Sequence, residues 1–327
     1  MMTAAILALA VQPQLVDLGV PGAFLETFEQ LRRVTARINN AGTIMVSFWD
    51  NQGAVTFQWK RGALKTIKNF TVRDLNDHDV AVGGEWSGSS TIPAILEGGR
   101  LTQVGAGMKG EATGINNPGD IVGYFWPKKG DQQGWLFSHG KLRFLSRPGT
   151  SWVEPADIDD HGNILATWGP GGASEDAFLG FIRGGKRQSF HKAKQFWCGL
   201  TQCNSHGDAI GEIDGVEAVY GFMWLKGKAT TEPFYLLTSG INESGTVVGA
   251  QSRYREDPPR EEVATIWRDG KMSRLQDLLP TSTTWTLERA LAINDKDEIV
   301  GYGRNAGKRA VFLLRLSGQT SRAASTP

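Results

Sequence analysis

Two aspartates stand where paired acid chemistry could occur. Asp74 and Asp157 each lie two residues before a recurring Asn or Asp, at Asn76 and Asp159. Two carboxylates held near one another can act as general acid and general base, as in the cleavage of glycosidic bonds. A second interpretation stays open, because the other copies of the pattern carry mixed residues at this position: Arg37, Gly114, Gln202, Gly240 and Ala292. Such a mixture is typical of a crowded interior with a few polar groups, and we assign no catalytic residue.

Aromatic residues recur at fixed distances from the same Asn or Asp. Ten residues after it stand Trp49, Trp86 and Trp126 in three copies, and nine after it stands Trp168 in a fourth. Seven residues before it, three copies carry an aromatic residue: Trp152, Trp197 and Tyr235. Exposed indole faces can stack on sugar rings, so these seven residues are our candidate ligand-binding set. The alternative is that the rings wedge between packed sheets and bury apolar area. We expect Trp126 and Trp152 to face solvent.

Metal and cofactor chemistry finds little support in the remaining residues. Three histidines stand two residues after the repeated Asn or Asp and would lie on separate turns, too far apart to share one zinc ion: His78, His161 and His206. Cys203 takes an apolar position of the pattern, so we expect a buried thiol, and a disulfide to Cys198 would need a bulge between them. We therefore expect neither a metal site nor a cofactor.

A repeated pattern sets all of these distances. An apolar residue precedes the Asn or Asp. Two variable residues follow it, then usually a Gly, and then an apolar pair and a small residue. Seven copies place the Asn or Asp at positions 39, 76, 116, 159, 204, 242 and 294. The spacings of 37, 40, 43, 45, 38 and 52 residues indicate one structural unit near 40 residues with loops of variable length.

Each unit is predicted to form four antiparallel strands. Asn or Asp followed three residues later by Gly is typical of a hairpin turn, with Gly in the left-handed conformation. A third strand precedes a second Gly, as in Trp135-Leu136-Phe137, and a short fourth strand follows it, as in Leu142-Arg143-Phe144-Leu145. Four strands in about 40 residues form a propeller blade, whereas helical repeats would show a period of 3.6 and few glycines. We predict an all-β seven-bladed propeller over residues 12–316.

The last copy lacks a fourth strand, because a polar tail follows Gly318. Leu15 to Val20, ahead of the first copy, resembles an unpaired fourth strand. We expect this N-terminal strand to complete the last blade and close the ring, since closure removes two exposed sheet edges. Between this strand and the first copy, the spacing of Phe24, Phe28, Leu31 and Val34 predicts a short helix over residues 22–35.

The pattern resembles a known group. Ile-Asn-x-x-Gly-x-Val-Val-Gly, followed by an apolar-aromatic strand, Gly-Lys-Met and a Leu-rich strand, is similar to the HAF family of probable extracellular repeats. The stretches 114–142, 239–275 and 290–314 carry the resemblance best, and Leu15 to Gly19 is similar to that family's Asp-Leu-Gly strand. The resemblance implies a propeller-like, often exported protein of unassigned biochemistry, and it transfers no catalytic residue.

Composition and the chain ends limit the partners. Lys and Arg number 35 against 34 Asp and Glu, so the charge does not predict binding to nucleic acid. No apolar run is long enough to span a membrane. Residues 1–11 contain a signal-like apolar run without a basic start, which favours an extracellular or periplasmic location over a cytoplasmic one. We expect residues 317–327 to be a disordered tail and the protein to be a monomer.

The function predicted from sequence is a non-catalytic binding propeller. Its aromatic-rich face would be presented to a glycan, a peptide or a protein partner. The alternative is a propeller hydrolase or lyase whose acids, Asp74 and Asp157, line the axial channel. Acids that share one axial pocket would favour the enzyme, and an open surface lined by Trp would favour glycan binding.

Overall fold

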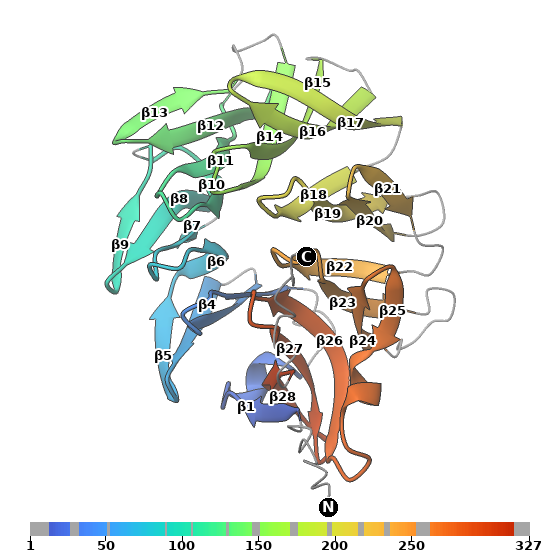
Figure 1. The fold of residues 1–327 in the computed structure, drawn as a ribbon. Coiled ribbons are helices and arrows are strands. Elements are labelled where there is room, and N and C mark those ends of the chain that lie inside the picture. The colour runs from blue at the N-terminus through green and yellow to red at the C-terminus, as the bar shows by residue number, and fades with distance from the viewer. Residues whose placement is uncertain are drawn as a thin grey trace, which may run out of the picture.

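The computed structural model describes residues 13–26, 33–50, 53–88, 90–105, 107–128, 131–145, 151–170, 176–194, 198–214, 219–231, 236–252 and 262–316. Within these ranges, 28 strands form seven four-stranded antiparallel sheets. Two short 3-10 turns, η1 (Gly22–Phe24) and η2 (Leu275–Leu278), complete the regular structure of these ranges. The sheets surround a central axis as the blades of a propeller (Figure 1). None of the described helical segments is long and apolar enough to cross a membrane.

Each of the first six blades is four strands consecutive in sequence, from the axis outward. Blade 1 contains β2 (Val34–Ile38), β3 (Ile44–Asp50), β4 (Gly53–Lys60) and β5 (Ala63–Lys68). Blade 2 contains β6 (Phe70–Leu75), β7 (Ala81–Ser87), β8 (Ser90–Glu97) and β9 (Arg100–Gln103). Blade 3 contains β10 (Gly110–Ile115), β11 (Ile121–Phe125), β12 (Gln133–Ser138) and β13 (Lys141–Phe144).

The next blades repeat this order. Blade 4 contains β14 (Ser151–Ile158), β15 (Ile164–Pro170), β16 (Asp176–Arg183) and β17 (Lys186–Lys194). Blade 5 contains β18 (Cys198–Cys203), β19 (Ala209–Asp214), β20 (Val219–Leu225) and β21 (Lys228–Thr231). Blade 6 contains β22 (Leu236–Ile241), β23 (Val247–Ser252), β24 (Glu262–Arg268) and β25 (Lys271–Arg274).

Blade 7 joins the two ends of the described chain. It contains β26 (Trp285–Ile293), β27 (Glu298–Asn305) and β28 (Lys308–Arg315), and β1 (Gln14–Asp17) pairs with β28 as the fourth strand. Val16 lies opposite Leu313, and Asp17 lies opposite Phe312. Leu18 follows the strand into the core between blades 7 and 1, where it is 3% exposed. The seven-bladed fold and its closure by the N-terminal strand are therefore confirmed.

The repeated Asn or Asp forms the hairpin turn between the first two strands of every blade. In blade 1 the Oδ1 atom of Asn39 accepts the N–H of Thr43 at 2.9 Å, which closes the turn. Gly42, three residues after Asn39, has a φ of 79°. In two blades Asp replaces this Gly and still adopts the left-handed conformation: Asp79 and Asp297. The predicted left-handed Gly is confirmed in five copies, and the turn itself forms in all seven.

A β-bulge interrupts most of the inner hairpins. In six of the seven described hairpins, the pairing of the innermost strand shifts just before the position that Asp74 and Asp157 occupy in blades 2 and 4. The hairpin of blade 1 has no such shift. A bulge changes the direction in which the following side chains point. It therefore decides which residues of the inner strands face the axis.

The structure tests one of our three predictions about the chain ends, the helix near the N-terminus. Within the described part of residues 22–35 the predicted helix is wrong, because Gly22–Phe24 forms only the short η1 turn and Val34 already begins β2. Apolar spacing alone misled us there, since Val34 is the first buried residue of a strand that alternates between buried and half-buried. The signal-like segment 1–11 and the tail 317–327 lie outside the described residues.

Candidate functional site

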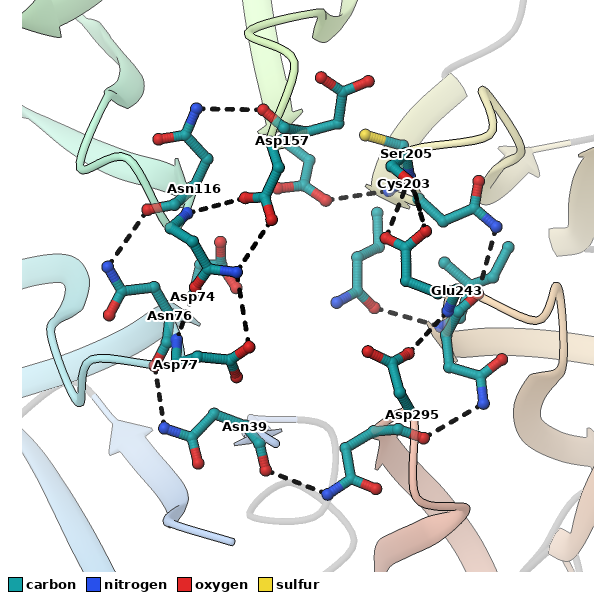
Figure 2. A pocket seen from close by; sticks show the side chains of 18 of the residues that line it. Asn39, Asp74, Asn76, Asp77, Asn116, Asp157, Cys203, Ser205, Glu243 and Asp295 are labelled. Carbon is teal, nitrogen blue, oxygen red and sulfur yellow. Dashed lines mark hydrogen bonds between the residues drawn. The ribbon is translucent and has the colours of Figure 1, made fainter. Parts of the chain in front are cut away.

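A circle of six asparagines and one aspartate surrounds the axial pocket at the turn end of the propeller (Figure 2). We call it the asparagine circle, and its members are the seven repeated residues Asn39, Asn76, Asn116, Asp159, Asn204, Asn242 and Asn294. The Nδ2 atom of Asn39 donates to the carbonyl oxygen of Asn76 at 2.9 Å, and the same bond recurs from blade to blade. Asn294 donates to Asn39 at 3.0 Å, so the bonds continue across the closing blade.

The asparagine circle is open at one interface. Asp159 has no N–H on its side chain, so it cannot donate to Asn204 as the other members do. A second set of bonds at the mouth of the pocket, such as Asn40 N to Asp77 Oδ1 at 2.8 Å, links the residues that follow the circle. The acidic groups at the mouth accept hydrogen bonds from neighbouring blades, which accounts for their presence.

Asp74 and Asp157 line this same axial pocket, whose volume is about 600 Å³ (Figure 2). Asp74 Oδ1 accepts the N–H of Leu75, and Oδ2 accepts the N–H of Ile115 in the next blade, both at 2.8 Å. Asp157 Oδ1 accepts the N–H of Ile158 at 2.8 Å, and Oδ2 accepts the N–H of Cys203 in the next blade at 2.9 Å. All four carboxylate oxygens therefore accept backbone N–H groups, and one oxygen of each acid joins its blade to the next.

The electrostatics of these acids follow from burial. Burial raises the pKa of Asp157 well above its ordinary value, and the negative charge of Asp74 adds to that rise. Burial also raises the pKa of Asp74, and Arg37, whose Nε lies 3.8 Å from Asp74 Oδ1, partly offsets the rise. Gly114 makes room for this arrangement, because a Cβ there would lie 2.9 Å from Asp157 Oδ1.

The histidines and the thiol at this end form no reactive group. Among the described residues, no cluster of three or more His, Cys, Asp or Glu is placed to hold a metal ion. His206 is exposed, and its Nδ1 lies 3.2 Å from Glu243. Cys203 is a free thiol that lines the axial pocket. Burial, with the nearby charge of Asp157, raises the pKa of this thiol well above its ordinary value, which disfavours the nucleophilic thiolate.

Three of the seven predicted aromatic residues lie together at the opposite end of the blades. Trp49, Trp86 and Trp126 line one pocket of about 410 Å³, which we call the tryptophan pocket. They come from the distal ends of the second strands in blades 1, 2 and 3. Trp49 and Trp86 are half-buried, and Trp126 is 51% exposed, as we expected for that residue.

Backbone pairing places these three side chains at the same level along the propeller axis. The N–H of Trp86 donates to the carbonyl oxygen of Asn69 at 2.8 Å, and the N–H of Trp126 donates to that of Lys109 at the same distance. Trp49 donates to Arg33 at 3.4 Å. Each bond joins the end of the second strand to the residue just before the innermost strand. The same hairpin geometry in three adjacent blades therefore brings the three indoles to one pocket.

An ion pair between half-buried Arg73 and buried Glu111 lines the same pocket as the tryptophans. Arg73 Nη2 lies 2.7 Å from Glu111 Oε2, which also accepts the hydroxyl of Tyr124 at 3.2 Å. The Arg73 guanidinium lies over the Trp49 ring at 5.6 Å, and the Tyr124 ring contacts the Trp126 ring edge-on at 4.9 Å. Glu111 is 7% exposed, and its Oε1 has no hydrogen-bond partner among the described residues. The ion pair thus orients two of the aromatic faces and leaves one carboxylate oxygen for a ligand.

The tryptophan pocket borders a second cavity on the axis. That cavity has a volume of about 280 Å³ and shares Arg73 and Glu111 with the tryptophan pocket. Threonines of three neighbouring blades line it: Thr113, Thr167 and Thr201. Polar and aromatic surfaces are therefore adjacent at this end of the propeller.

The other four predicted residues do not line the tryptophan pocket. Trp168 is 7% exposed and stacks against Phe178 at 6.5 Å, so it packs within the sheets. Trp152, which we expected to face solvent, is instead half-buried against the core of blades 4 and 5, because the missing side chain at Gly169 makes room for its indole. Trp197 and Tyr235 lie outside the described residues.

Sequence reasoning missed the polar half of the tryptophan pocket. Arg73, Lys109 and Glu111 lie three, seven and five residues before the repeated Asn of their blades. Lys109 stands at the same distance from its Asn as the aromatic Trp152 does from Asp159. That shared position was the available signal, because it places a charged side chain at the level of the predicted aromatic residues.

Comparison with known proteins supports the fold and goes no further. No protein-family model matches the chain, and no curated protein matches it. One of two prolyl endopeptidases is 11% identical with a TM-score of 0.54, over 88% of this chain and 50% of that one. A Mycobacterium tuberculosis puromycin-hydrolyzing peptidase is 9% identical with a TM-score of 0.52, over 83% and 50%.

A propeller domain aligns over more of its own length. The β-propeller domain of the Trilobed protease from Pyrococcus furiosus is 14% identical with a TM-score of 0.50, over 76% of this chain and 82% of that domain. That domain is described as having an open velcro topology, whereas β1 closes the ring here. The alignments with the two peptidases span half of their length, so the likeness concerns the propeller fold.

Proposed function

We propose that the protein is a non-catalytic binding propeller and that a glycan binds in the tryptophan pocket. The observation that carries this proposal is the convergence of Trp49, Trp86 and Trp126 around the Arg73–Glu111 pair. Indoles present broad apolar faces that suit the C–H surface of a sugar ring. The Oε1 atom of Glu111, which has no partner among the described residues, suits the donor of a sugar hydroxyl.

The size of the pocket favours a glycan over a peptide or protein partner. Its volume of about 410 Å³ falls within the range of small-ligand sites, about 300–1,000 Å³. A stable protein interface covers about 800 Å² on each partner, which calls for a larger continuous surface. A saccharide of a few units matches both the volume and the mixture of aromatic and polar groups.

The alternative of a hydrolase or lyase gains no advantage from the axial acids. Asp74 and Asp157 share a pocket, as that alternative requires, but each of their four oxygens accepts a backbone N–H. A proton transferred through either acid would compete with a backbone N–H for the same oxygen. A role in joining the blades therefore accounts for both residues.

For location and assembly we propose an exported monomer that resembles the HAF family. Export rests on the apolar run within residues 1–11, and the monomer rests on the closed ring, which leaves no unpaired edge between the first and last blades.

The proposal is tested by calorimetric titration of the protein with xylohexaose, cellohexaose and hexagalacturonate. At least one should bind, and Trp126→Ala should weaken that binding about tenfold, because an aromatic contact contributes on the order of 1 kcal/mol. Phe144→Ala is the matched control, since Phe144 is 48% exposed and lies outside the pocket. Failure of all three sugars to bind, or an equal loss in both variants, would refute glycan binding in this pocket.

A further inference from the structure

The tryptophan pocket carries one positive charge that no acid balances within the described part of the chain. Three ionised side chains line it: Arg73, Lys109 and Glu111. Arg73 and Glu111 neutralise one another, since their nitrogen and oxygen atoms lie 2.7 Å apart. Lys109 has no ion-pair or hydrogen-bond partner for its side chain among the described residues, and it is exposed at the rim. The pocket is therefore cationic at one defined place.

Lys109 is fixed next to the most exposed indole. Its carbonyl oxygen accepts the N–H of Trp126 at 2.8 Å, so the two residues lie opposite one another across the β10–β11 hairpin. The Tyr124 ring, 4.9 Å away, holds the Trp126 ring from the side. A sugar stacked on Trp126 would thus present its substituents to the Lys109 ammonium group.

We propose that the tryptophan pocket selects an acidic saccharide, one whose carboxylate or sulfate pairs with Lys109 while its ring stacks on Trp126. This inference rests on the proposed glycan-binding function. A charged acceptor forms a stronger hydrogen bond with an ammonium group than a neutral hydroxyl does. Glu111 does not oppose the anion, because Arg73 cancels its charge and its free Oε1 remains an acceptor for a hydroxyl.

The test compares one sugar with and without its charge. Hexagalacturonate and its fully methyl-esterified form have the same backbone, so their affinities differ only through the carboxylates. Calorimetric titration at low salt should show the acid binding about tenfold more tightly than the ester. Lys109→Gln should abolish that preference, and Lys109→Arg should retain it. A sulfated carrageenan hexasaccharide, titrated in parallel, distinguishes a sulfate-binding from a carboxylate-binding site.

The control is Lys271→Gln, which removes the same charge from an exposed residue on the outer strand β25. It should leave the preference intact, which separates a local ion pair from the effect of overall charge. Equal affinity for acid and ester in the unmodified protein would overturn the acidic-saccharide inference and leave glycan binding standing. Absence of binding to every sugar, including the neutral ones, would overturn both.

Discussion

At the scale of single residues, Asp74 and Asp157 show how acids typical of a catalytic pair can serve to join sheets. Their type, their equal position in two blades and their common pocket all agree with acid chemistry. Their hydrogen bonds support the joining role that we propose, because each carboxylate accepts one N–H of its own strand and one of the next blade. At the other end of the blades, the hydrogen bonds of Glu111 within the described residues engage only Oε2, which accepts from the side chains of Arg73 and Tyr124.

The raised pKa of Asp157 predicts a specific dependence of stability on pH. Because its pKa in the folded protein lies above the unfolded value of about 3.9, the folded state keeps a proton that the unfolded chain has lost. This contribution to stability is complete below the unfolded pKa and is lost as pH rises through the folded pKa. Asp157→Asn removes the titration, so the free energy of unfolding should fall less steeply with pH than in the unmodified protein.

Urea unfolding midpoints measured between pH 4 and pH 8 provide the check for Asp157. In Asp157→Asn the amide nitrogen cannot accept a backbone N–H, so stability should be lower by a constant amount at every pH. The slope of stability against pH reports the titration of Asp157. Asp269→Asn, in an exposed turn, serves as the control. Parallel curves for the unmodified protein and Asp157→Asn would show that the pKa of Asp157 is not raised in the folded protein.

At the scale of the structural element, the repeated Asn does two tasks in each hairpin. Its Oδ1 closes its own turn, and its Nδ2 donates to the next blade, as Asn116 does to Asp159 at 3.0 Å. Asp can perform the first task and not the second, which explains why the asparagine circle is open after Asp159. There Asp157 joins blades 4 and 5 through Cys203 instead. The turn motif of the sequence is thus also the means by which neighbouring blades are joined.

Asn116→Asp separates the two tasks, because it keeps the turn acceptor and removes the donor to the next blade. Asn116 is buried, so the change leaves the Asp159 carbonyl without its partner and adds a charge. We expect the free energy of unfolding to fall by about 1–3 kcal/mol. Asn69→Asp makes the same substitution at an exposed turn and should change stability by less than about 0.5 kcal/mol. Chemical unfolding at pH 7 checks both, and equal stabilities would contradict the role of the circle.

At the scale of the whole molecule, closure depends on a segment far from blade 7 in sequence. β1 pairs with β28, and Leu18 continues into a core that also contains Val20, Val311 and Leu313. The N–H of Leu18 donates to the Val311 carbonyl at 3.0 Å. Loss of this segment would leave the β28 edge unpaired, and an exposed edge promotes association with other chains.

Leu18→Ala should therefore destabilise the entire propeller. A buried leucine replaced by alanine costs about 2–5 kcal/mol, and the affected interface is the one that closes the ring. Leu64→Ala is the control, because Leu64 is 38% exposed on the outer strand of blade 1. Thermal unfolding with light scattering should show a lower midpoint and earlier aggregation for Leu18→Ala. Coincident curves for the two variants would mean that closure contributes little to stability.

The sequence alone determined the blades and their number, because these depend on local turn chemistry. It also determined the closure, because the last copy lacks a fourth strand and an unpaired strand precedes the first copy. Asn39 and Gly42 specify a turn whatever surrounds them. Those predictions needed only residues near one another in the chain, together with the rule that sheets avoid open edges.

Only the tertiary structure decided which aromatic residues share a pocket and what joins them there. Trp126 stands ten residues after its Asn and Trp168 nine after its Asp, and on a strand a shift of one residue reverses the face. Bulges in the inner strands change these directions again, so period alone could not place Arg73, Lys109 or Glu111. The tryptophan pocket lies between residues of blades 1, 2 and 3, and their positions depend on how these separate segments of the chain pack.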